Sequence, residues 1–245
     1  MAFSELQASR KVRFNAGAAE LDAGKVQTQR KRDDGMKVHQ GRVLVFKDRT
    51  TKEWSCFPLP DRIIEKSKRG GVTERKAEVA VEIKKRFKEG SVMASDASPA
   101  FKSVNKDLNK TTRGIPAITA NHSSKPKKTF VTTVRVKVKD MAPKLKKLVV
   151  KKPSARIVRM AGGDNAVEGL IGTGKKGMDR QNMRGRRTGK KSHINFLASL
   201  WQLRHPGLAG VLKALQVHRE SLQDTTDPKH FYEYQDWLGE VEPTK

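Results

Sequence analysis

Three acidic residues of this chain have the spacing and local context of metal-binding carboxylates: Asp22, Asp96 and Glu168. Asp22 ends the apolar run Ala-Ala-Glu-Leu, Asp96 ends Ser-Val-Met-Ala-Ser, and Glu168 follows Asn165 by one helical turn. Hard divalent cations prefer carboxylate oxygens, and two such ions roughly 3.5–4 Å apart can activate an attacking hydroxyl and stabilise a leaving oxygen. Taken singly, each acid is explained as a solvated carboxylate. Taken together, they predict a catalytic centre that binds two Mg²⁺ or Mn²⁺ ions.

The charge of the chain indicates the kind of partner. Lys and Arg number 52 against 26 acids, which gives a net charge of +26 that repels itself until a polyanion neutralises it. No apolar stretch reaches the roughly 20 residues that span a bilayer, and no long amphipathic basic helix is apparent. Nucleic acid is therefore the favoured partner, and a membrane is not expected.

The predicted elements of the first half bring Asp22 and Asp96 to one sheet. Residues 18–23, 41–48 and 53–60 read as three short strands of an antiparallel meander, the last stopped by its prolines. A helix over 73–88, with Thr73 as its N-cap, separates them from a strand over 91–96. A strand-helix-strand unit favours parallel pairing with a right-handed crossover, which places Asp96 at the carboxyl end of its strand.

The second half reads as helices and extended stretches around a basic segment. Residues 139–152 are lysine-rich, and we expect them to become ordered only on a partner. Asp164 or Asn165 is a good cap for a helix that runs toward Met178, and Ser192 for a later apolar helix. The remaining predictions are a helix at 99–108, extended stretches at 115–122 and 130–138, and a helix at 207–222.

Four local motifs resemble those of one known family. They are Glu20-Leu21-Asp22; Ser95-Asp96 through Pro99-Ala100-Phe101; Asn121-His122-Ser123 followed by Phe130-Val131; and Asn165-Ala166-Val167-Glu168-Gly169. Over about residues 18–205 the chain resembles the DDE transposases of bacterial insertion sequences and the related eukaryotic Merlin transposons. The resemblance implies an α/β fold of the ribonuclease H type, a mixed sheet flanked by helices, with basic insertions and a helical C-terminal part.

The same resemblance implies roles for single residues. Asp22, Asp96 and Glu168 would be catalytic and would bind the two metal ions, and His122 and Asn165 would position the substrate. Cations after Glu168 would contact DNA phosphates, with a solvated helix face as the alternative: Lys175, Lys176, Arg180, Arg184, Arg186 and Arg187. The substrate would be DNA, both transposon ends and target, and the working form a homo-oligomer.

The chain also departs from this family. Asp22 is followed by Ala-Gly, where acidic and aromatic residues are common in the family, and the N-terminal DNA-binding module that recognises transposon ends is missing. We therefore keep a second hypothesis beside catalysis. It is a non-catalytic basic nucleic-acid-binding protein, either a domesticated transposase or a component of a ribonucleoprotein or chromatin particle.

The predicted organisation is an N-terminal arm over 1–17, the catalytic-type domain over 18–205 and a C-terminal helix and tail over 206–245. The start of the chain lacks the order of a secretory signal, so we expect it in the nucleus of a eukaryote or with the nucleoid in bacterial cytoplasm. Cys56, the single cysteine, reads as a small apolar residue in a strand.

Overall fold

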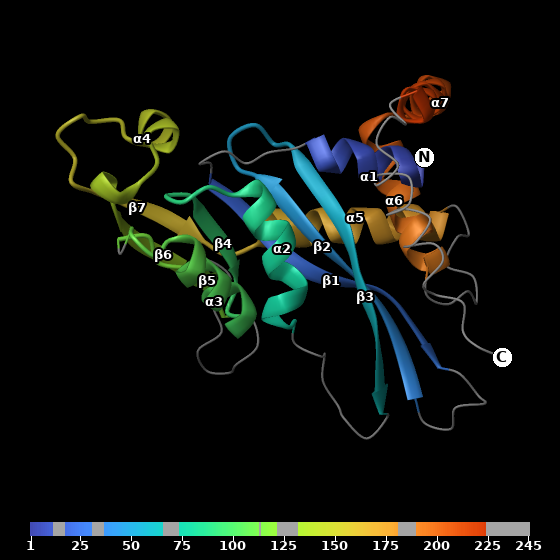
Figure 1. The fold of residues 1–245 in the computed structure, drawn as a ribbon, viewed down its shortest axis with the longest axis horizontal. Helices are drawn as coiled ribbons and strands as arrows, with labels where there is room; N and C mark the ends of the chain where they lie inside the picture. Colours follow the sequence, from blue (N-terminus) through green and yellow to red (C-terminus); the bar gives the residue numbers. More distant parts are fainter. Residues whose placement is uncertain are drawn as a thin grey trace.

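The fold is an α/β arrangement around a mixed five-stranded sheet, as predicted (Figure 1). The structure is a computed structural model that describes residues 1–11, 18–30, 37–65, 74–112, 114–121, 132–180 and 190–223. The strand order in the main sheet is β3-β2-β1-β4-β5. Its strands are β1 Ala18–Arg30, β2 Lys37–Asp48, β3 Trp54–Glu65, β4 Val92–Asp96 and β5 Ile118–Ala120.

The first three strands form the predicted antiparallel meander, but they are longer than predicted. The expectation that prolines end β3 is wrong, because β3 continues through Pro58 and Pro60 to Glu65. The reason is position, since β3 is an edge strand and proline on an edge need not interrupt the ladder. The backbone N–H of Cys56 on this strand donates to Ser9 Oγ at 2.9 Å. Helix α1, Ala2–Lys11, thus lies against β3.

The predicted parallel crossover is confirmed, because β4 pairs with β1 in parallel and with β5 in parallel. Helices α2 Lys76–Arg86 and α3 Pro99–Leu108 contribute to the core on one face of the sheet. The predicted cap Thr73 lies outside the described residues; α2 instead begins after Arg75, whose N–H donates to Glu78. The core on this face includes Phe46, Ile83 and Phe101 among its buried side chains.

The opposite face of the sheet is covered by two long helices, α5 Asn165–Arg180 and α6 Lys190–Arg204. Helix α5 begins where predicted, and α6 begins two residues before Ser192, the predicted cap. Its end before His205 and the following helix α7, Gly207–Gln223, agree with the prediction. The core here joins Val43 and Val45 of β2 to Val167, Ile171 and Phe196 of the helices.

A two-stranded antiparallel sheet, β6 Thr132–Lys137 with β7 Ile157–Gly162, lies at one end of the molecule (Figure 1). Between its strands the chain forms a short 3₁₀ turn, Val138–Asp140, and helix α4, Pro143–Val149. The expectation that 139–152 is ordered only on a partner is therefore wrong. Leu145 is completely buried with Met141 and Val136 in a third apolar cluster, so this lysine-rich segment has its own anchor in the core.

Glycines determine how closely α5 approaches α6. A Cβ atom on Gly174 would lie 2.6 Å from Phe196 Cε2, and Phe196 is buried and has no room to move away. A Cβ atom on Gly169 in the same helix would meet nothing within 4 Å. Glycine at 174 is therefore required by packing, and glycine at 169 is not.

We predict that Gly174→Ala lowers the free energy of unfolding by about 1–2 kcal/mol, because overpacking outweighs the gain in helix propensity. The matched variant Gly169→Ala should raise that free energy by about 0.5–1 kcal/mol. Urea unfolding of both variants measures the two effects. An equal rise in both would show that α5 does not approach α6 as described.

Candidate carboxylate site

Asp22 and Asp96 come together because their strands are paired neighbours. The parallel register of β1 and β4 places Glu20 opposite Ala94 as its last pair. Two residues further along both strands, on the same face, are Asp22 and Asp96. Paired strands lie about 4.8 Å apart, so the two carboxylates occupy neighbouring positions just beyond the ladder. The predicted placement of the two acids on one sheet is confirmed, and their metal-binding role stays a prediction.

A third carboxylate beside Asp22 belongs to Asp164, at the start of α5. Its side chain is buried, at 1% exposure, and its backbone carbonyl accepts from the N–H groups of Val167 and Glu168 at 2.9 Å each. Asp164 is thus the N-cap that the sequence predicts. The positive end of the α5 dipole favours a negative charge at this position.

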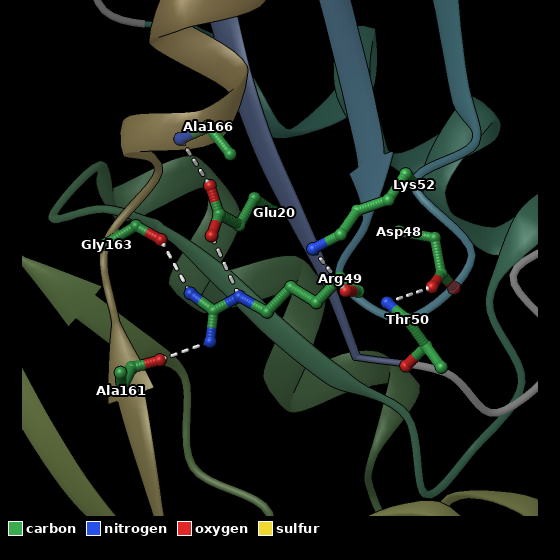
Figure 2. A network of polar contacts seen from close by, with 8 residues as sticks. All are labelled: Glu20, Asp48, Arg49, Thr50, Lys52, Ala161, Gly163 and Ala166. Atoms are coloured by element: carbon green, nitrogen blue, oxygen red, sulfur yellow. Dashed lines mark hydrogen bonds and ion pairs between the residues drawn. The ribbon is translucent and has the colours of Figure 1, made fainter.

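A charged network fixes the start of α5 against β1 (Figure 2). Glu20 Oε2 accepts from the N–H of Ala166 at 2.8 Å, and Glu20 Oε1 pairs with Arg49 Nε at 2.9 Å. Arg49 also donates to the carbonyl oxygens of Ala161 and Gly163, the latter at 3.0 Å. One arginine therefore ties β1, the end of β7 and the residue before Asp164 together.

Repulsion among carboxylates characterises the site. The pKa of Asp22 is raised from 3.8 to about 7, first by burial and then by the negative charges of Asp164, Asp96 and Glu74. A hydrogen bond from the N–H of Ala23 to Asp22 Oδ1, 2.7 Å long, opposes this rise only in part. Burial also raises the pKa of Glu74, and Asp96 raises it further. Among the described residues, the side-chain charges that shift the pKa of Asp22 belong to acids: Asp164, Asp96 and Glu74.

Asp96 and Glu74 are connected through the turn that follows β4. The N–H of Ser98 donates to Asp96 Oδ1 at 3.0 Å, and the hydroxyl of Ser98 donates to Glu74 Oε2 at 3.4 Å. Ser98 is also the residue before α3, so the turn from strand to helix holds both acids. Four carboxylates from four different segments thus lie near enough to repel one another, beside the first half of β1 and the carboxyl end of β4.

The other predicted site residues lie away from this group or outside the described residues. Glu168 is on the exposed side of α5, one turn after Asp164, and Asn165 is exposed at the first position of the helix. Among the predicted DNA contacts, Lys176 is exposed, Lys175 is half-buried and Arg180 is the last residue of α5. The residues outside the described part of the chain are His122, Arg184, Arg186 and Arg187.

Sequence reasoning missed four residues of the site as such: Glu20, Arg49, Glu74 and Asp164. The sequence indicates Asp164 as a helix cap, since an acid often precedes an apolar helix. Because capping explains the acid by itself, nothing in the sequence indicates that Asp164 also lies beside Asp22. Glu20 shares the alternation of Asp22, so the two point to one face of β1. Nothing near Arg49 or Glu74 in the sequence indicates which distant residues they meet.

The carboxylate oxygens of the site are ligands that suit a divalent cation, but their positions do not form a complete metal-binding site. Asp22, Asp96 and Asp164 offer hard oxygen ligands, and a cation would relieve the repulsion that raises the pKa of Asp22. Within the residues that the structure describes, no three His, Cys, Asp or Glu side chains are placed so that they could hold a metal ion.

Burial raises the pKa of Cys56 well above its usual value, which makes its thiol unreactive.

Comparisons with protein-family models, with curated proteins and with solved structures find no match for this chain. In the described part of the chain, no helix has the length and apolar character needed to cross a bilayer. The function therefore has to be argued from the site itself.

The raised pKa of Asp22 predicts a pH dependence of stability. Because its folded pKa lies near 7 and its ordinary value is 3.8, the stability that Asp22 contributes is full below about pH 4 and is lost as the pH rises through 7. Asp22→Asn removes this loss. The variant should gain on the order of 2 kcal/mol over wild type between pH 4.5 and pH 8, in the presence of a chelator.

Urea unfolding of both proteins across this pH range measures the difference, in which titrating groups that do not interact with Asp22 cancel. Asp107→Asn is a suitable control, since Asp107 is an acid on α3 with its own ion pair to Lys76, 2.6 Å long. A gap between Asp22→Asn and wild type that stays constant with pH would contradict the described surroundings of Asp22.

Proposed function

We propose that this chain is the catalytic domain of a DDE-type transposase, which uses divalent metal ions to cleave DNA strands and transfer them. The observation that carries the proposal is the mutual repulsion of Asp22, Asp96 and Asp164, which lie near one another beside β1 and the end of β4. A chain with twice as many cations as acids brings one buried and two half-buried carboxylates together there. Such a cluster destabilises the fold unless cations bind to it, so a function is its best explanation.

The fold supports the proposal. A ribonuclease H-like domain was expected to combine an antiparallel meander, a crossover helix and a parallel strand that ends in the second acid. The described sheet has these parts in this order, with Asp96 as the last residue of β4. Helix α5 returns across the sheet and brings an acid to Asp22.

Each residue has a distinct role in this proposal. Asp22 and Asp96 would supply oxygen ligands from the two strands, and Arg49 with Glu20 would hold the third acid in place. Mg²⁺ or Mn²⁺, when bound, would activate the attacking water or 3′-hydroxyl and stabilise the leaving oxygen. Basic side chains around the acids would bind the phosphate backbone of the DNA.

Two acids compete for the third position. The family motif Asn165-x-x-Glu168 favours Glu168, whereas burial beside Asp22 favours Asp164. The two residues lie one helical turn apart, about 6 Å along α5, so both can serve one site only if the helix end or the side chains adjust. We propose Asp164 as a ligand of the site, with Glu168 facing the substrate side.

A second function has one observation in its favour. The described acids are not arranged as a ready metal site, which suits a nucleic-acid-binding protein that has kept the fold without the catalysis. The high positive charge serves such a protein equally well.

We predict that cleavage or strand transfer of duplex DNA with Mn²⁺ falls by at least about 100-fold in Asp96→Asn, because loss of a metal-binding carboxylate removes metal-assisted catalysis. Asp164→Asn should lose activity to a similar extent. Asp107→Asn is the matched control and should retain wild-type activity, since it removes only a partly exposed ion pair.

Assays of strand cleavage and strand transfer on labelled DNA compare the activities of these three variants, and of Glu168→Gln, with that of wild type. Equal activity in wild type and Asp96→Asn would refute metal-dependent catalysis at this site. Full activity in Asp164→Asn with none in Glu168→Gln would instead refute the role given to Asp164.

A further inference from the structure

The small sheet β6–β7 has one face in the core and one in solvent. Val136 and Met160 point inward and are buried in the third apolar cluster. The alternate residues of both strands are exposed and form three cross-strand pairs: Thr133 with Ala161, Arg135 with Arg159, and Lys137 with Ile157. We call these six residues the ribbon face.

The central pair of the ribbon face places two positive charges opposite each other. Directly opposed residues in an antiparallel pair have Cβ atoms about 4.5–5.5 Å apart, and like charges there are destabilising. Arg135 and Arg159 stand in this relation, with Lys137 two residues along. Packing does not require arginine at either position, because both side chains point into solvent.

Neighbouring cations strengthen the positive electrostatic potential around Arg135 and Arg159. Residues 132–162 contain ten Lys and Arg residues and one acid, Asp140. Nine of the ten cations are exposed and the tenth, Lys146, is half-buried, so nearly all of this charge faces solvent. The cations are Arg135, Lys137, Lys139, Lys144, Lys146, Lys147, Lys151, Lys152, Arg156 and Arg159.

We propose that the ribbon face binds the phosphate backbone of double-stranded DNA and thereby holds the substrate of the carboxylate site. The choice of DNA rests on the proposed function. A dense row of cations fits a polyanion, and a two-stranded ribbon has the width to enter the major groove of B-form DNA, which is about 12 Å wide. Residues 132–162 contain no Phe, Tyr or Trp, so the stacking surface typical of single-strand binding is missing from them.

The connection to the acids is short and stiff. Asp164 follows Arg159 by five positions, so their Cα atoms lie at most about 18 Å apart, roughly half of one turn of duplex DNA. Arg49 fixes this stretch by binding the carbonyl oxygens of Ala161 and Gly163. Thr132 Oγ1 anchors the other strand by donating to the carbonyl of Thr119 at 2.7 Å. DNA on the ribbon face would therefore be held at a fixed position relative to Asp164.

The test is duplex binding by the double variant Arg135→Gln/Arg159→Gln, measured by fluorescence anisotropy in EDTA over a range of salt concentrations. We expect about tenfold weaker binding near 0.1 M salt, and a slope of log K against log[salt] that is less steep by about 2. The charge-retaining pair Arg135→Lys/Arg159→Lys should restore most of that slope. The thermal unfolding midpoint of the Gln variant should be unchanged or higher, because the cross-strand repulsion is removed.

The matched control is Lys213→Gln/Arg219→Gln, which removes two exposed charges from α7, far from the ribbon in Figure 1. It should change duplex affinity by less than about threefold. Equal losses in the two Gln variants, an unchanged affinity in the ribbon variant, or equally tight binding of single-stranded DNA or duplex RNA would overturn the proposal. Because binding is measured without metal, an inactive carboxylate site would leave these results unaffected.

Discussion

The bond network of Arg49 is the constraint on which the rest of the site depends. Arg49 follows β2, yet it pairs with Glu20 on β1 and holds the carbonyl oxygens on both sides of Gly162. Glu20 uses its second oxygen to receive the N–H of Ala166 in the first turn of α5. Breaking such a partly buried pair leaves a buried carboxylate without its cation, which is costly. The network therefore determines where Asp164 lies. It thereby determines how strongly the negative charge of Asp164 raises the pKa of Asp22.

The electrostatics of the molecule are divided in space. Four of the acids, Asp22, Glu74, Asp96 and Asp164, lie near one another beside β1 and the end of β4, where burial and mutual repulsion raise the pKa of Asp22. Cations dominate the surface of the β6–β7 end and its helix α4. If the acids bind metal ions and the ribbon face binds phosphates, as proposed, this division is the one that a metal-dependent enzyme acting on nucleic acid requires. Such a function would explain why the chain retains a carboxylate cluster that lowers the stability of the fold.

The main sheet could be predicted from the sequence where the local residue pattern is enough to identify a strand and its place in the sheet. The strand ending in Asp96 and the crossover beside it follow from apolar runs and handedness, and both are confirmed. The extension of β3 beyond Pro58 depends on its place at the sheet edge, which is decided by tertiary contacts. The composition of the lysine-rich segment 139–152 predicts a connector, because its charges outweigh Leu145, although this one buried side chain anchors α4. Asp164 was recognised as a cap, and its meeting with Asp22 depends on Arg49, a contact more than 100 residues away in sequence.

The central claim is that Asp22, Asp96 and Asp164 together attract a divalent cation. A crystal structure of the protein soaked in Mn²⁺, with anomalous diffraction data, tests it most directly. We predict an anomalous peak within about 2.5 Å of oxygens from Asp22 and Asp96, and its loss in crystals of a variant that lacks the Asp22 carboxylate. Well-ordered carboxylates with no peak between them, or a peak that persists without Asp22, would contradict it.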